Sequence, residues 1–369
     1  MLETHLVRIA AHDTRLSAFI TVDADGARRQ ADACDVARRP IGALHGVPIA
    51  VKDLTNTKGL RTTYGSLLFQ HNVPEHNELV VARLRQAVAV VIGKTNTPEF
   101  GFGAVCANHL CGPTRNPFDP ALTSGGSSGG SAVAVATGMA ALAHGTDFGG
   151  SVRTPASFCD VVSIRPTPGR IPSPARSLGW DMLATHGFLA RSIADVEQVS
   201  PDCSGAIEAF RTLRAAHVAD AYGDLLRDRR AELTPTVIWN IEAGGQLKAQ
   251  DYLSAERRRT AIYRSFRDLF AHKDFLVAPA ASVFPWMNDA GDVMEIDGVG
   301  LETPIDYLAV TFIVSLVGFP VLTLPTPRRR DEKPFGVQII AAPGQEARLF
   351  AFGRRIEEQL GFSHIRPVL

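Results

Sequence analysis

The chain has 369 residues, and its 38 lysines and arginines balance its 38 aspartates and glutamates, so the formal net charge is zero. This balance argues against a protein that binds nucleic acid or a membrane surface by electrostatic attraction. Hydrophobic residues make up 45% and charged residues 21% of the chain, which excludes a disordered or fibrous class. We therefore expect a folded globular protein of one or two domains.

Short apolar runs alternate with segments of helical periodicity along the whole chain. In order, the pattern predicts a strand at residues 47–51, helix 79–85, strand 87–92, buried helix 131–142, helices 207–226 and 252–270, strands 275–278, 321–324 and 336–340, and helix 346–360. Such alternation is typical of an α/β protein in which helices cover a mostly buried sheet. The charged run at residues 328–333 is expected to be a solvated turn between two strands.

Two long stretches, residues 121–146 and 307–327, contain no Asp, Glu, Lys or Arg. The second approaches the roughly 20 apolar residues of a membrane span. However, Gly318 and Pro320 interrupt it, so we expect a buried helix followed by a short strand. The first begins with Gly and Ser, which predicts a loop that leads into a buried helix.

The five cysteines are scattered, odd in number and without a C-x-x-C pair, so neither a disulfide framework nor a zinc site is predicted. The first residues lack the basic segment and apolar run of a secretion signal. We expect a cytoplasmic protein.

The densest chemical signal is the Gly/Ser loop at residues 123–131, followed by a second Gly-rich turn at residues 145–153. Glycines allow backbone N–H groups to approach a ligand closely, and a helix N-terminus favours negative charge. No Lys follows the glycines as a phosphate loop requires, which disfavours nucleotide binding.

Residues 126–130 also match the G-x-S-x-G pattern of a nucleophile elbow, with Ser128 as the nucleophile. An elbow should follow a strand, whereas residues 115–120 have the composition of a turn. It also needs an acid and a histidine, for which Asp195 and His217 are available but not distinguished by any pattern. An α/β-hydrolase-like esterase that uses Ser128 therefore remains an alternative.

At this point the chain resembles a known family, the amidase signature hydrolases. The matching segments follow the family's order mainly across residues 40–200: 46–53 (GVPIAVKD), 93–100 (GKTNTPEF), 125–131 (GGSSGGS), 145–153 (GTDFGGSVR), 166–170 (PTPGR) and, more weakly, 334–339 (PFGVQI). The resemblance implies an α/β/α layered fold with a mixed central sheet covered by helices on both faces. It also implies a single domain over residues 1–369, with the signature core at about 40–200, a variable helical substrate segment at about 201–300 and a C-terminal segment at about 301–369 that completes the sheet.

The resemblance places a Ser-cisSer-Lys triad on three residues of this chain. Ser151 is the nucleophile, Ser127 the bridging serine after a cis peptide bond, and Lys52 the base. Backbone N–H groups of the second Gly-rich turn would form the oxyanion hole: Phe148, Gly149, Gly150 and Ser151. Chemistry of this kind needs no metal and no cofactor.

An unperturbed Lys with a pKa near 10.4 is neutral in only about one molecule in several thousand at pH 7. Lys52 must therefore be buried, since desolvation lowers the pKa of a Lys. The apolar run before it, residues 47–51, agrees with a buried position. For Asp147 and Arg153, which flank Ser151, we expect a structural ion pair rather than a role in the reaction.

The chain also departs from the family's pattern. Asp160 and Ser163 stand where members often carry glycine, and if either position needs positive φ, the local backbone is expected to differ. After residues 190–196, the family usually continues through a long segment, but here Ser200 leads almost at once into Pro201. A natural deletion, an engineered one or missing residues would each explain the short segment.

The leading prediction is an amidohydrolase that cleaves carboxylic amides of small molecules through an acyl-enzyme on Ser151, with ester and carbamate bonds kept open. The alternative from the same family is the glutamine-hydrolysing subunit of a tRNA-dependent amidotransferase. A catalytically silent binding protein is disfavoured because the three triad residues are intact. We expect a small-molecule amide as partner, no nucleic acid and no membrane, and leave a homodimer open. Aromatic and apolar side chains are expected to line an acyl pocket for an aryl or alkyl group: Tyr64, Phe102, Phe284, Trp286 and Met287.

Overall fold

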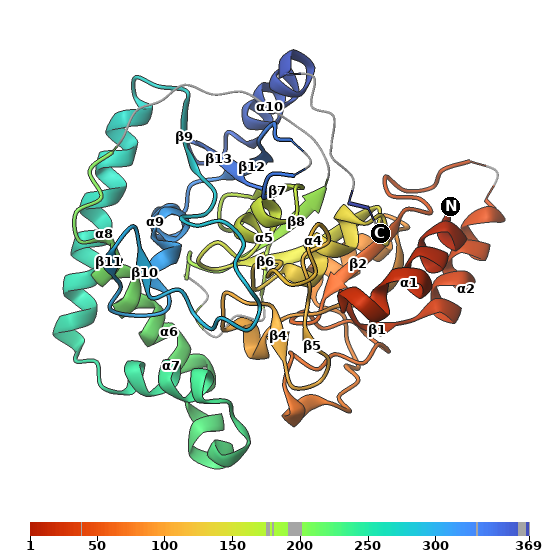
Figure 1. Ribbon diagram of the computed structural model, residues 1–369, viewed down its shortest axis with the longest axis horizontal. Coiled ribbons are helices and arrows are strands. Elements are labelled where there is room, and N and C mark those ends of the chain that lie inside the picture. The colour runs from red at the N-terminus through yellow and green to blue at the C-terminus, as the bar shows by residue number, and fades with distance from the viewer. Residues whose placement is uncertain are drawn as a thin grey trace.

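A mixed sheet runs through the middle of the computed structural model (Figure 1), which describes residues 1–37, 39–174, 178, 181–190, 201–329, 331–360 and 367–368. Within these residues the sheet has nine strands in the order β1-β3-β2-β6-β8-β7-β12-β13-β9. Strand β2 is parallel to both β3 and β6, and the other neighbours are antiparallel. The strands are β1 (Phe19–Val22), β2 (Pro48–Lys52), β3 (Val90–Thr95), β6 (Leu142–Asp147), β7 (Val162–Arg165), β8 (Thr185–Ala190), β9 (Phe275–Pro279), β12 (Val321–Pro325) and β13 (Gly336–Ala341).

Helices pack on both sides of this sheet, and two small hairpins lie outside it. The hairpins pair β4 (Ala107–Asn108) with β5 (Gly112–Pro113) and β10 (Glu295–Ile296) with β11 (Val299–Gly300). The helices are α1 (Leu2–Leu16), α2 (Ala24–Asp35), α3 (Leu79–Gln86), α4 (Gly129–Ala136), α5 (Arg153–Phe158), α6 (Ala206–Arg229), α7 (Pro235–Gly245), α8 (Ala249–Phe270), α9 (Ala309–Val317) and α10 (Glu346–Leu360). In Figure 1, α1 and α2 lie at one end of the molecule and α6, α7 and α8 at the other.

Alternation along β12 shows that both faces of the sheet are covered. Val321 lies in an apolar cluster with residues of α6, α8 and α9, whereas Leu322 and Leu324 lie in a cluster with Leu349 and Ile356 of α10. Successive side chains of a strand point to opposite faces, so one strand contacts both helical layers. The predicted α/β fold with a mixed, doubly covered sheet is confirmed.

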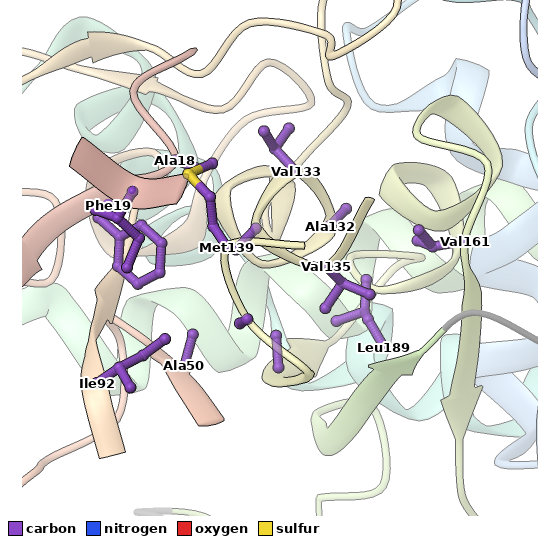
Figure 2. Close-up of a cluster of buried hydrophobic side chains, with 14 of the residues drawn as sticks. Ala18, Phe19, Ala50, Ile92, Ala132, Val133, Val135, Met139, Val161 and Leu189 are labelled. Carbon is purple, nitrogen blue, oxygen red and sulfur yellow. The ribbon is translucent and has the colours of Figure 1, made fainter. Parts of the chain in front are cut away.

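Helix α4 lies deep in the core (Figure 2). Its side chains Ala132, Val133 and Val135 pack with Ala50 of β2 and Leu189 of β8 in one buried cluster. Small residues are required here, because a Cβ on Gly130 would lie 2.4 Å from the carbonyl oxygen of Ala18. The lack of charge in residues 121–146 follows from this burial, since an unpaired charge in an apolar core is costly.

Several predicted boundaries were wrong, and two of them have a clear cause in the backbone. The buried helix ends at Ala136 and not at residue 142, because Gly138 adopts a left-handed φ of 69° and Leu142 already begins β6. The strand predicted from residue 87 starts at Val90, because Val88, with a φ of 65°, closes the turn that ends α3. The pattern did not indicate the helices α1, α2, α5 and α7 or the strands β1, β6, β7 and β8.

The apolar stretch at residues 307–327 forms α9 and then β12, as predicted. Among the residues that the structure describes, no helix is long and apolar enough to cross a membrane.

The charged run at residues 328–333 lies between β12 and β13 in the chain. Its described residues 329 and 331–333 are exposed, but its first residue, Arg328, turns inward. The Arg328 guanidinium lies 4.4 Å from the ring centre of Phe118 and 3.6 Å from Asp160 Oδ2. Asp160 itself has a φ of 57°. The backbone at Asp160 therefore keeps the positive φ that suits glycine. Asp tolerates this conformation better than most residues, so the backbone does not have to differ from a glycine-containing one at this position.

Candidate active site

The carboxyl ends of three parallel strands meet at one edge of the sheet. Strand β2 lies between β3 and β6, and its last residue is Lys52; the last residue of β6 is Asp147. Functional sites of open α/β sheets are commonly found at this edge. The Gly/Ser loop before α4 and the Gly-rich turn after β6 both reach it.

Lys52 is completely buried and surrounded by hydroxyl groups. Its Nζ donates to Ser127 Oγ at 2.7 Å, Ser128 Oγ at 2.9 Å and Thr146 Oγ1 at 3.0 Å. Burial lowers the pKa of Lys52 to about 7, although the nearby Cys106 and Asp147 favour the charged form. Three acceptors match the three N–H groups of an ammonium, while the lowered pKa makes the neutral amine accessible near neutral pH.

The loop that carries Ser127 is fixed by close backbone contacts. The peptide bond between Gly126 and Ser127 is cis. A Cβ on Gly126 would lie 2.9 Å from the carbonyl oxygens of both Gly103 and Ala104, so the loop has no space for a larger residue. The Ser128 N–H donates to the Ser151 carbonyl oxygen at 3.0 Å, which connects the two serine loops.

Asp147 anchors the turn that carries Ser151. Its carboxylate accepts from the N–H groups of Gly150 and Val152, both at 3.1 Å, and pairs with Arg153 at 2.9 Å and Arg165 at 3.1 Å. Burial would raise the pKa of Asp147, but the two guanidiniums overcome this and hold it well below its usual range. The predicted Asp147–Arg153 ion pair is present and includes a second arginine.

The second Gly-rich turn has little free space around it. Gly150 has a φ of 134°, and a Cβ there would lie 2.4 Å from Thr311 Oγ1. Because the Gly150 N–H is already bonded to Asp147, it would have to be shared with any anion that binds at this turn.

Ser127 and Ser151 line the same cavity, which has a volume of about 540 Å³. Phe148 and Gly149 of the second Gly-rich turn also line it. A further part of the lining comes from α6 and α7 and includes Phe210, Arg214, His217, Val218, Tyr222, Trp239 and Asn240. The sequence predicted α6 without indicating which of its faces would meet the serine loops, although these residues do recur at helical spacing.

The predicted acyl-pocket residues are mostly placed elsewhere. Of the five, Phe102 lines the cavity. Tyr64 packs edge-on against Phe69, and Trp286 packs edge-on against Phe158. Phe284 lies tilted against Phe335, and Met287 pairs through its backbone with Leu122. None of these four lines the cavity, and Phe284 and Met287 are exposed at the surface. The prediction was wrong for them, because composition does not reveal whether an apolar side chain packs against a neighbour, faces a cavity or lies at the surface.

Other candidate residues have structural surroundings. Ser128 is fully buried at the start of α4, where its Oγ donates to the Thr146 carbonyl oxygen at 3.2 Å, and the residues directly before it form a loop rather than a strand. His217 lies on α6, 3.3 Å from Asp181. Asp195 and the short segment near Ser200 lie outside the described residues.

A second buried lysine, Lys94, lies near Lys52 on β3. Its Nζ donates to Thr57 Oγ1 at 3.1 Å and Thr62 Oγ1 at 2.9 Å and lies 3.9 Å from Asp53, and burial lowers its pKa to about 8. None of these partners is a serine of the two loops, so Lys94 is suited to hold residues 53–62 in place. In the described part of the chain, no group of three or more His, Cys, Asp or Glu side chains is arranged to hold a metal ion.

The sequence and the fold of the chain both resemble those of known proteins. Curated relatives include a glutamyl-tRNA(Gln) amidotransferase subunit from Roseiflexus sp. (strain RS-1), which is 44% identical over 193 residues, 52% of this chain and 39% of that protein. The matched region therefore covers about two fifths of the length of that relative.

Solved structures match over nearly the whole chain. A crystal structure of an amidase has a TM-score of 0.86 and 28% identity, with 97% of this chain and 95% of that chain covered. A structure described with the evolutionary origins of an s-triazine catabolic enzyme has a TM-score of 0.84 and 27% identity, with 100% and 96% covered. The amidase family model matches residues 1–219 and 204–350. The chain therefore belongs to the amidase family.

Proposed function

We propose that this chain is a serine amidase that hydrolyses carboxylic amides of small molecules through an acyl-enzyme on Ser151. The observation that carries the proposal is the buried contact of 2.7 Å between Lys52 Nζ and Ser127 Oγ, beside a cavity that Ser151 also lines. A serine hydroxyl is a weak nucleophile until a base removes its proton. Lys52, with a pKa lowered to about 7 by burial, is such a base near neutral pH.

In the proposed reaction, Ser151 Oγ attacks the carbonyl carbon of the amide. Ser127 accepts the proton of Ser151 and passes its own proton to neutral Lys52. The proton then returns through Ser127 to the leaving nitrogen, the C–N bond breaks, and the acyl group remains on Ser151 as an ester. Water attacks this ester with the same proton relay and releases the carboxylic acid. The sequence of steps consumes one water and regenerates all three side chains.

Negative charge on the carbonyl oxygen would be stabilised by backbone N–H groups of Phe148, Gly149, Gly150 and Ser151. Loss of one such donor typically costs about 3 to 4 kcal/mol of transition-state stabilisation in other hydrolases. Asp147 supports this role indirectly, because its bonds to the Gly150 and Val152 N–H groups fix the turn.

A fluorophosphonate label mapped by mass spectrometry tests the nucleophile. We expect an adduct on Ser151 in the wild type and in Ser128→Ala, and none in Ser151→Ala. In Lys52→Ala, we expect amide turnover to fall by about 10² to 10⁴-fold, the usual contribution of a general base. An adduct on Ser128, or full turnover in Lys52→Ala, would refute the proposed roles.

A second candidate function is suggested by the relatives that are named as amidotransferase subunits. The match covers about half of this chain, and assembly with partner proteins would be needed. Glutamine hydrolysis that is stimulated by partner proteins from the same cell would favour this role, whereas efficient hydrolysis of other amides by the isolated chain favours the amidase.

A further inference from the structure

One wall of the cavity contains a buried cation that has no carboxylate partner in the described chain. Arg214, on α6, lines the cavity and is only 9% exposed. Its Nη1 donates to Asn240 Oδ1, and its guanidinium lies 5.6 Å from the ring centre of Phe102. Burial lowers the pKa of Arg214 to about 10, so it still carries its charge at neutral pH. Burying a charge without a counterion costs free energy of folding, so we expect Arg214 to have a function that offsets this cost.

The acidic groups along the same cavity are engaged elsewhere or lie at its exposed parts. Asp147 pairs with Arg153 and Arg165, and Glu78 pairs with His186 at 3.0 Å. Asp220 and Asp292 also line the cavity but are exposed, and neither forms an ion pair with Arg214 in the described structure. The guanidinium therefore faces the cavity with unused hydrogen-bonding capacity for an anion.

Arg214 is close to the reaction centre along α6. Phe210, one helical turn earlier, contacts the Gly-rich turn that carries Ser151. Its Cζ lies 3.2 Å from the position that a Cβ on Gly149 would occupy. The α carbons of Phe210 and Arg214 are four residues apart, which is about 6 Å along the helix axis. An acyl chain of a few methylene groups is long enough to connect a carbonyl at Ser151 with an anion at Arg214.

We propose that Arg214 binds a carboxylate of the substrate, so that the preferred substrates are amides that carry a second, ionised carboxyl group a few carbons from the scissile bond. A planar guanidinium forms paired hydrogen bonds with a carboxylate, and Asn240 holds one edge of it in place. The aromatic neighbours then cover the methylene chain. This inference rests on the proposed amidase function and replaces the expected aryl or alkyl acyl group with an anionic one.

The direct test compares ω-amide monocarboxylates (succinamate, glutaramate and adipamate) with neutral alkyl amides of matched length. For the wild type, we expect kcat/KM of the best carboxylate substrate to exceed that of its neutral partner by about tenfold or more, as for hydrogen bonds to charged groups. In Arg214→Gln, we expect kcat/KM for that carboxylate substrate to fall by about 30-fold or more. Turnover of the neutral amides should change little.

Two further variants separate substrate binding from a structural role. Arg214→Lys keeps the charge without the paired donors and should retain an intermediate preference. Arg227→Gln removes an arginine from the same helix whose side chain is 68% exposed, and should leave the preference unchanged. Circular dichroism monitors folding. If Arg214→Gln does not fold, competitive inhibition of the wild type by succinate, glutarate or adipate, stronger than by the matched alcohols, provides the test.

Failure of the inference differs from failure of the proposed function. A wild type that is labelled on Ser151 and prefers neutral amides refutes the role of Arg214 alone, as does a preference for carboxylates that survives in Arg214→Gln. If Ser151 is not labelled and no amide is hydrolysed, the proposed function fails. Calorimetry with glutaramate then decides the inference: binding that is lost in Arg214→Gln supports it, and no binding refutes it.

Discussion

At the scale of single residues, burial of one amine determines the pH range in which the proposed chemistry works. Lys52 acts as a base only when it is neutral, and burial lowers its pKa to about 7. We therefore expect kcat/KM for a neutral amide to rise with pH through an apparent pKa of about 7 and to level off above it. A pH–rate profile between pH 5 and 9 measures this. A profile that is flat across this range would contradict Lys52 as the base.

Asp147 is the residue whose loss should destabilise the site most. Asp147→Asn leaves Arg153 and Arg165 buried without a full counter-charge, so we expect the free energy of unfolding to fall by about 3 to 5 kcal/mol. Denaturant unfolding measures the loss. Asp224→Asn is the control, because its ion pair with Arg227 is exposed and should change stability by less than about 1 kcal/mol.

The stabilisation by Asp147 should also depend on pH. Its pKa is held below the usual range in the folded chain, so the folded state binds the proton less readily than the unfolded state. The contribution is fully present above the unfolded pKa of about 4 and is lost progressively as the pH falls from there towards the lower pKa of the folded state. The difference between wild type and Asp147→Asn should therefore shrink in acid.

At the scale of elements, the loop before α4 positions Ser127 through backbone contacts that leave no room for a side chain. In Gly126→Ala, the new Cβ would lie 2.9 Å from two carbonyl oxygens, so we expect the loop to shift and amide turnover to fall at least about tenfold. The matched control is Gly223→Ala within α6, where nothing lies within 4 Å of the new Cβ. Alanine there should stabilise the helix by about 0.5 to 1 kcal/mol and leave turnover unchanged.

Steady-state kinetics and thermal unfolding of the two glycine variants distinguish a local effect from a general one. Equal turnover in both variants would show that the close contacts around Gly126 do not position Ser127.

At the scale of the whole molecule, we propose that residues 1–369 form a single domain, because the C-terminal strands lie inside the sheet. Strand β12 lies between β7 and β13, and β9 pairs with β13 at the edge. Arg153 also bonds to the Thr311 carbonyl oxygen and, at 3.0 Å, to Gln338 Oε1. The C-terminal segment therefore supports the turn that carries Ser151.

A chain that ends at residue 300 should aggregate, because β7 would become an exposed edge strand and β9 would lose its partner. Soluble yield and size-exclusion chromatography measure this. Co-expression of residues 301–369 as a separate chain is expected to restore soluble protein. A soluble, monodisperse truncated chain that is still labelled on Ser151 would contradict the single-domain proposal.

The sequence by itself determined the layered α/β fold, because strand and helix periodicities and the uncharged core segments depend on local composition. It also predicted the burial of Lys52 and the ion pair between Asp147 and Arg153. These predictions were possible because the motifs within residues 40–200, taken in order, identify the loops that form the candidate site. Only the tertiary structure decided which face of α6 meets the serine loops and brings Arg214 to the cavity. That placement depends on packing between segments far apart in the chain, and a hydrophobic pattern does not encode a helix's orientation towards a distant loop.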